Sequence, residues 1–92
     1  LTLNERTRDV RRAGHRASLT VTEYELLRFL MANAGRALTR EVIFNRIRRF
    51  DFAGDPRLVG RHVTRLRRKI DAGGLPSMIH TVRGVGYILE NR

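Results

Sequence analysis

The chain has 92 residues, and its 19 lysines and arginines against 9 aspartates and glutamates give a formal net charge of +10. That length suits one domain with one hydrophobic core, and the excess of positive charge indicates a polyanionic partner. The absence of cysteine excludes disulfides and thiol chemistry. The sequence has neither an apolar run long enough to span a membrane nor a signal-peptide pattern, so we expect a cytoplasmic protein.

The N-terminal part of the chain predicts a small antiparallel meander. Runs compatible with strands lie at residues 1–3, 7–12 and 17–19, and turn-like residues at 4–6 and 13–14 separate them. The chain starts without methionine inside the first of these runs, so we expect it to be part of a longer protein.

The most apolar helix is expected next. Thr22 and Glu25 have the spacing of a capping box, which predicts that this helix begins at Thr22. Gly35 is placed to end it in a left-handed turn. Its apolar residues recur at helical spacing and make it the core helix: Leu27, Leu30, Met31 and Ala34.

A second helix and a loop follow. Thr39 is expected to cap the helix, which packs on one side only. Its short apolar stripe comprises Val42, Ile43, Ile47 and, at its end, Phe50. Residues 49–55 have no clear period and predict an ordered loop, in which Phe50 and Phe52 pack on the second helix. The alternative is that this loop binds a partner.

Residues 55–70 predict an amphipathic helix around which the rest of the chain is organised. Asp55 is a fitting N-cap, Pro56 a fitting first helical residue, and residues 71–74 supply a stop. At about 100° per residue one face is apolar and the opposite face is cationic. The apolar face comprises Val59, Val63, Leu66 and Ile70.

The cationic face is predicted to dock into a nucleic-acid groove. Five arginines and one lysine lie between Arg57 and Lys69 with no acid among them, whereas a helix that only improves solubility usually mixes signs. Arg57 and Arg67, at the edges, are expected to bind phosphates. The central positions are expected to face bases: Arg61, Thr64, Arg65 and Arg68. The alternative is a solvated basic face.

The C-terminal residues predict a β-hairpin with strands at 78–82 and 87–89. Arg83 lies at its turn, where it suits a minor-groove or phosphate contact, or is an exposed arginine without a partner. Thr81 either donates to a phosphate or simply pairs within its strand. The order of strands, three helices and hairpin gives an α+β domain with a helix-turn-helix-like core and a C-terminal wing.

The sequence contains no constellation typical of catalysis or metal binding. His15 and His80 lie far from each other and from any carboxylate at ligand spacing. The carboxylates form no pair, and no nucleophile motif surrounds Ser18 or Ser77. We therefore expect no enzyme activity, no metal and no cofactor. His62 borders the buried face and is expected to pack there, with a DNA contact as the alternative.

Three segments resemble the C-terminal effector domain of OmpR/PhoB-type bacterial response regulators. They read LTVTEYELL over 19–27, VTRLRRKI over 63–70 and TVRGVGY over 81–87. The resemblance covers nearly the whole chain and implies a winged helix-turn-helix with an N-terminal antiparallel sheet, three helices and a C-terminal β-hairpin wing. It also implies sequence-specific binding of double-stranded DNA, with a recognition helix at about 56–70 in the major groove and a wing at about 78–89 at the minor groove.

The resemblance further implies a two-component regulator with an N-terminal receiver domain, which is absent from residues 1–92. A sensor kinase phosphorylates that receiver, and the full-length protein then dimerises on direct-repeat half-sites. We expect the isolated domain to be a monomer off DNA and to bind no membrane.

Family positions carry over onto this sequence residue by residue. The DNA-contact positions are Arg57, Arg65, Arg67, Thr81, Arg83 and Tyr87, with Thr64 at a variable base-facing position. The loop that can contact RNA polymerase in the family corresponds to Arg49, Phe50, Asp51, Phe52 and Asp55. Two positions depart from the family pattern. Arg48 stands where tryptophan is common, and Gly60 stands where a larger residue is commoner, which weakens the helix by up to about 1 kcal/mol relative to alanine.

Two functions of other classes remain open from the residues alone. Charge does not distinguish DNA from RNA, so an RNA-binding or ribosome-associated domain is one alternative, although it lacks the exposed aromatic residues such modules often use. The other is a module whose basic helix binds an acidic protein or a membrane surface. The core's need for the apolar stripe argues against that second alternative.

Overall fold

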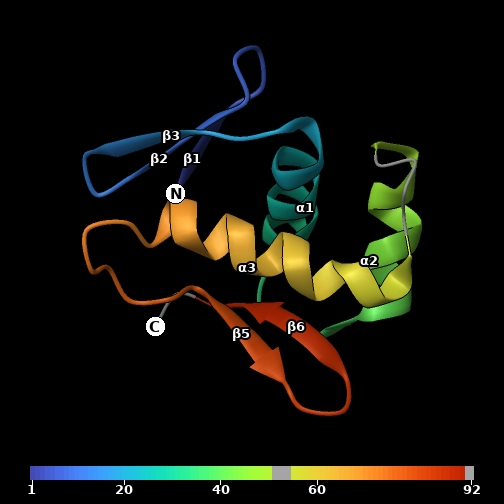
Figure 1. Cartoon of the computed structure of the whole chain (residues 1–92). Coiled ribbons are helices and arrows are strands. Elements are labelled where there is room, and N and C mark those ends of the chain that lie inside the picture. Colours follow the sequence, from blue (N-terminus) through green and yellow to red (C-terminus); the bar gives the residue numbers. More distant parts are fainter. Residues whose placement is uncertain (51–54, 91–92) are drawn as a thin grey trace.

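The structure, a computed structural model, describes residues 1–50 and 55–90. An N-terminal sheet and a C-terminal sheet lie on either side of a group of helices (Figure 1). The strands are β1 Thr2–Asn4, β2 Asp9–Arg12, β3 His15–Ser18, β4 Leu38–Thr39, β5 Ile79–Val82 and β6 Gly86–Leu89. The α-helices are α1 Val21–Ala32, α2 Arg40–Ile47 and α3 Val59–Ile70, with 3-10 turns at Arg48–Phe50 and Pro56–Leu58. None of the helices in the described part is long and apolar enough to cross a membrane.

The N-terminal meander is confirmed. β2 pairs antiparallel with both β1 and β3, and Val10 at its centre is 2% exposed because it faces the core. β2 begins at Asp9, two residues later than predicted. Arg8 has a φ of 58°, which belongs to a turn and not to a strand.

The predicted start of α1 is wrong by two residues. The capping box is formed by Thr20 and Glu23: the Thr20 hydroxyl accepts from the Glu23 N–H, and the Glu23 carboxylate accepts from the Thr20 N–H. Thr22 lies inside the helix and donates to the Phe50 carbonyl. Both threonines have the required spacing to a glutamate, but Glu23 is the one that meets both the Thr20 N–H and Lys69.

The predicted end of α1 is also too late. The helix ends at Ala32 with Asn33 as its C-cap, so Ala34 lies outside it and is exposed. Gly35 does adopt the left-handed conformation, with a φ of 83°. It belongs to the turn that follows the helix, where its N–H donates to the carbonyl of Leu89.

The C-terminal hairpin is confirmed, but the sequence missed its third strand. β4 pairs antiparallel with β6, so the sheet order is β4-β6-β5. Gly86 is required at this junction, since a Cβ there would overlap the Leu38 carbonyl oxygen. A strand of two residues has no periodicity that a sequence could reveal.

α2 is capped as predicted, because the Thr39 side chain accepts from the Val42 N–H at 3.1 Å. Its buried face is narrower than predicted. Ile43 and Ile47 are buried, whereas Val42 is 45% exposed and lies off that face. The helix ends at Ile47, and a 3-10 turn carries the chain on to Phe50, which is half-buried.

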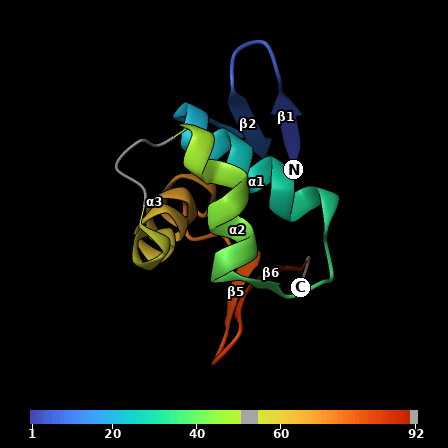
Figure 2. The ribbon, with the colours of Figure 1, turned by 90° about the vertical axis from the view of Figure 1, so that its right-hand side faces the viewer.

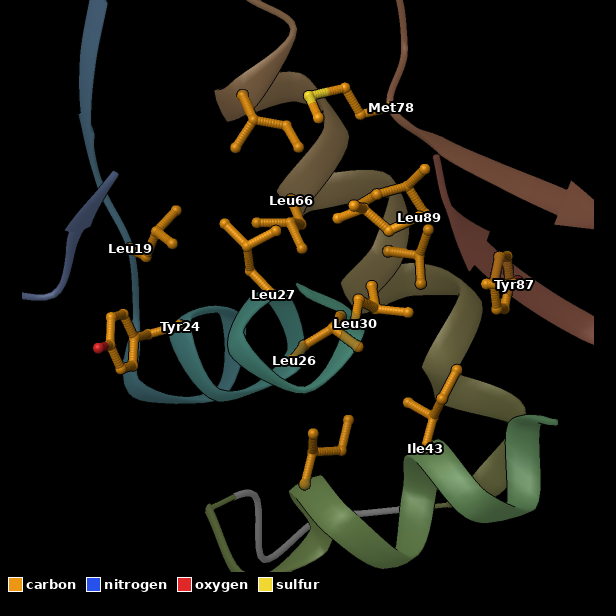
Figure 3. Packing of buried hydrophobic residues seen from close by; sticks show 14 of the residues in the cluster. Leu19, Tyr24, Leu26, Leu27, Leu30, Ile43, Leu66, Met78, Tyr87 and Leu89 are labelled. Atoms are coloured by element: carbon orange, nitrogen blue, oxygen red, sulfur yellow. The ribbon is translucent and has the colours of Figure 1, made fainter. Parts of the chain in front are cut away.

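The core lies between the three α-helices and the two sheets. Leu66 of α3 lies beside Leu27 and Leu30 of α1, with Leu89 arriving from β6 (Figure 3). Fully burying such a side chain contributes roughly 1.5–3 kcal/mol. The whole apolar stripe predicted for α3 is buried in this core: Val59, Val63, Leu66 and Ile70.

Arg12 joins the N-terminal sheet to the C-terminal end of α3. Its guanidinium donates to the Ile70 carbonyl at 3.0 Å, to the Asp71 carboxylate at 2.7 Å and to the Pro76 carbonyl. The last carbonyls of a helix lack partners within the helix, and a cation there also complements the helix dipole. Arg12 therefore caps α3 from another part of the chain.

A second tie joins α1 to α3. Lys69 Nζ lies 2.6 Å from Glu23 Oε1, and the Glu23 side chain is only 4% exposed. Burial by itself would raise the pKa of Glu23, but hydrogen bonds from Lys69 and from the Thr20 N–H, together with the Lys69 charge, outweigh it. The pKa of Glu23 is therefore held below its ordinary value of 4.5.

This ion pair makes stability depend on acid pH. Because the pKa of Glu23 is lower in the folded than in the unfolded state, its stabilisation is present above the unfolded pKa and is lost as pH falls through the folded pKa. Glu23→Gln keeps an acceptor for the Thr20 N–H and loses the charge pair. We expect it to lower the free energy of unfolding by about 1–3 kcal/mol near neutral pH.

The measurement is denaturant unfolding at about pH 7 and at about pH 3. The difference in free energy of unfolding between the unsubstituted chain and its Glu23→Gln variant should be smaller at the lower pH. Glu25→Gln is the matched control, because its ion pair with the exposed Arg28 spans 4.0 Å and contributes less than about 0.5 kcal/mol. If that difference does not change with pH, the Glu23–Lys69 ion pair does not contribute the stability proposed for it.

Candidate nucleic-acid interface

The N-terminal end of α3 is built as the sequence predicts. Asp55 accepts from the Arg57 N–H at 2.9 Å, and Pro56 is the first residue of the turn. The first turn is a 3-10 turn over Pro56–Leu58 that leads directly into α3. The predicted stop is also confirmed, because α3 ends at Ile70 with Asp71 as its C-cap.

The four predicted base-facing residues lie together on the outer side of α3. Arg61, Thr64, Arg65 and Arg68 are all exposed. The Thr64 hydroxyl donates to the Gly60 carbonyl at 2.9 Å, which fixes its rotamer. The side chains of the three arginines form no ion pair with any residue that the structure describes. Their N–H donors therefore face solvent.

Arg57 is held at the start of this surface by Asp55. Its Nη2 lies 2.8 Å from Asp55 Oδ2, while 89% of its side chain is exposed. Hydrogen bonds from the Arg57 side chain and then from its N–H lower the pKa of Asp55, and the same pairing raises the pKa of Arg57. The pair orients a guanidinium that otherwise faces solvent.

Arg67 lies differently from the other cations of α3. It is half-buried, and its Nε donates to the Ile79 carbonyl at 3.0 Å. Its Nη2 donates to the Thr81 hydroxyl at 3.0 Å, and its guanidinium carbon lies 5.8 Å from the centre of the Tyr87 ring. No sequence pattern indicates these contacts, because they join residues that only the fold brings together.

The wing presents some of its predicted residues and buries another. Arg83 lies at the turn between β5 and β6, and both Arg83 and Thr81 are exposed. Gly84 gives the turn its left-handed residue, with a φ of 74°. Tyr87 is only 6% exposed, because it packs between the C-terminal sheet and α3. Little of its surface is therefore available to a ligand.

The two elements that carry the exposed cations lie next to each other. α3 crosses the molecule, and the β5–β6 hairpin lies below it (Figure 1). Figure 2, seen from the side, shows the hairpin extending beyond the helices. The exposed side of α3 and the turn of the wing thus lie close together, while the N-terminal sheet lies across the helices from the wing (Figure 1) and contacts α3 near its C-terminal end.

The predicted polymerase-contact loop is described only in part. Arg49 is exposed, with its guanidinium carbon 6.0 Å from the centre of the half-buried Phe50 ring. Asp51 and Phe52 lie outside the described residues. Asp55 is occupied as the cap of the following turn. Within the described ranges, no group of three or more metal-ligating side chains comes together.

Comparison with known proteins agrees with this arrangement. Residues 14–89 match the family described as "Transcriptional regulatory protein, C terminal". The chain is 52% identical over 90 residues to the transcriptional regulatory protein TrcR of Mycobacterium tuberculosis, covering 98% of this chain and 35% of that protein. It is 49% identical over 90 residues to the response regulator MprA of the same organism, covering 98% of this chain and 39% of that protein.

The chain thus spans 35–39% of the length of these two relatives. A solved structure of the DNA-binding domain of the response regulator AdeR, in complex with an intercistronic region, superposes with a TM-score of 0.83. The two are 31% identical, and the match covers 99% of this chain and 93% of that one. On these grounds the chain belongs to the family of transcriptional regulatory protein C-terminal domains, as a winged-helix effector domain of the OmpR/PhoB type.

Proposed function

We propose that this chain binds double-stranded DNA sequence-specifically, as the output domain of a two-component transcriptional regulator. The proposal rests mainly on one observation: Arg61, Arg65 and Arg68 are exposed on α3, and the opposite side of this helix is buried in the core. Such a helix fits the major groove, where an arginine fork can bind guanine O6 and N7. The AdeR domain, similar in fold, was solved with DNA.

In this proposal the other exposed residues contact either bases or phosphates. Thr64 lies among the arginines and meets a base edge or a thymine methyl group. Arg57 binds a phosphate at the start of α3, and Arg83 on the wing reaches a phosphate or the minor groove. The contacts of Arg57 and Arg83 add affinity for any sequence, whereas those of the central residues of α3 select one.

The same proposal extends to partners. Two relatives are named as regulators, one of them as a response regulator. The full-length protein is therefore proposed to be cytoplasmic, to dimerise on phosphorylation and to bind direct-repeat DNA half-sites. The segment from Arg49 to Asp55 is the proposed contact for RNA polymerase. Binding, and not catalysis, is the activity of this domain.

The salt dependence of binding tests the main proposal. With about 5 phosphates neutralised, the slope of log K against log salt should be roughly −4 to −5. The measurement is fluorescence anisotropy on a labelled duplex selected from random sequences, across a salt series. A slope near zero would refute DNA binding. Structured RNA is the control competitor. If it displaces the labelled duplex as efficiently as unlabelled duplex does, the RNA-binding alternative is favoured.

Two substitutions separate base reading from phosphate binding. Arg65→Ala should lower affinity for the selected site by about 1–3 kcal/mol and relax the preference for it over random duplex. Arg83→Ala should weaken both duplexes alike and reduce the salt slope by about 1. Arg28→Ala is the matched control, because this exposed arginine lies on α1 beside Glu5 of the N-terminal part. If Arg65→Ala and Arg83→Ala lower affinity for both duplexes equally, the assigned roles are wrong.

A further inference from the structure

Tyr87 occupies the joint between α3 and the C-terminal sheet. It lies on β6, the central strand of that sheet, in register with Leu38 of β4 on one side and Thr81 of β5 on the other. Figure 3 shows its ring at the end of the core where β6 passes α3. Its hydroxyl oxygen lies 3.1 Å from the point where a Cβ of residue 60 would stand. Glycine at position 60 therefore makes room for Tyr87.

Arg67 covers the same joint from further along α3. It lies seven residues after Gly60 and so on the same side of the helix. Its contact with the Tyr87 ring joins α3 to β6, and its hydrogen bonds to Ile79 and Thr81 join α3 to β5. One guanidinium thus holds both strands of the wing.

The direction of these contacts gives Arg67 a role within the protein itself. A guanidinium has five N–H donors in a rigid fork, and here the donors on Nε and Nη2 are directed into the wing. Lysine cannot reproduce that pattern, because its ammonium has no planar fork to span a carbonyl and a hydroxyl. Thr81, which Arg67 holds, lies two residues before Arg83 at the turn.

We propose that Gly60, Arg67 and Tyr87 form a joint that fixes the wing against the recognition helix, so that Arg67 and Tyr87 act as positioning residues. The joint sets where Arg83 lies relative to Arg61 and Arg65. Its effect on DNA rests on the proposed function, whereas its effect on the free protein does not.

The free chain tests the fit between Gly60 and Tyr87. Gly60→Ala improves helix propensity, but its methyl group meets the Tyr87 hydroxyl. Tyr87→Phe removes that oxygen and keeps the ring under Arg67. We expect Gly60→Ala to lower the Tm, or leave it unchanged, in the natural background and to raise it in the Tyr87→Phe background. If Gly60→Ala raises the Tm equally in both backgrounds, the proposed contact between residue 60 and Tyr87 does not exist.

A double-mutant cycle on DNA tests the positioning role. Arg67→Met and Arg67→Lys are each combined with Arg83→Ala, with circular dichroism to confirm folding. In the natural background Arg83→Ala should weaken binding by about fivefold to tenfold, as expected for one phosphate contact. In the Arg67→Met or Arg67→Lys background, Arg83→Ala should lower the affinity for DNA by less than about twofold, because a wing that is no longer fixed does not hold Arg83 in place.

Two independent phosphate contacts would behave differently. Arg83→Ala would then cost the same factor in every background, and Arg67→Lys would keep both the affinity and the salt slope, because it keeps the charge. That result would overturn the positioning role. Failure of the proposed function is seen separately, as the absence of salt-dependent binding by the unsubstituted chain, and the Tm comparison still decides whether the joint exists.

Discussion

The structure depends on one constraint, the fixed rotation of α3 about its own axis. Val63 and Leu66 are completely buried, so the helix cannot turn without pulling apolar surface out of the core at a cost of roughly 1.5–3 kcal/mol for each side chain. Arg12 holds its C-terminal end and Lys69 joins it to α1. Because the buried side is fixed, the residues of the exposed side are fixed as well, which is what a sequence-reading helix needs.

The same constraint divides the positive charges by task. Arg12, Arg67 and Lys69 are directed inward, where each holds one element against another. Arg61, Arg65 and Arg68 make no such contacts within the described residues and face solvent. A net charge of +10 destabilises a compact chain through self-repulsion. The proposed DNA ligand would relieve that repulsion where the unpaired cations gather.

Elements set by a local pattern are predictable from the sequence, whereas elements set by a distant partner are not. α3 was predictable because its stripe repeats at helical spacing and Asp55-Pro56 marks its start. The capping box of α1 is ambiguous in the sequence because Thr20 and Thr22 both satisfy the local rule, and the contact of Glu23 with Lys69 of another helix has no local signal. β4 is set by pairing with β6. The inward contacts of Arg67 and the burial of Tyr87 likewise come only from tertiary structure, so their family-based assignment as DNA contacts stays a prediction.

The surface that contacts DNA can be found by mapping backbone amide chemical shifts while a selected duplex is titrated into the protein. The largest changes should fall on the exposed side of α3, at Arg61, Thr64, Arg65 and Arg68, and at the wing turn around Arg83. The strands β1–β3 should change less, because they lie across the helices from the wing (Figure 1) and meet α3 near its C-terminal end, through Arg12 of β2. If the largest changes fell on β1–β3 and α3 were unaffected, α3 would not be the helix that binds DNA.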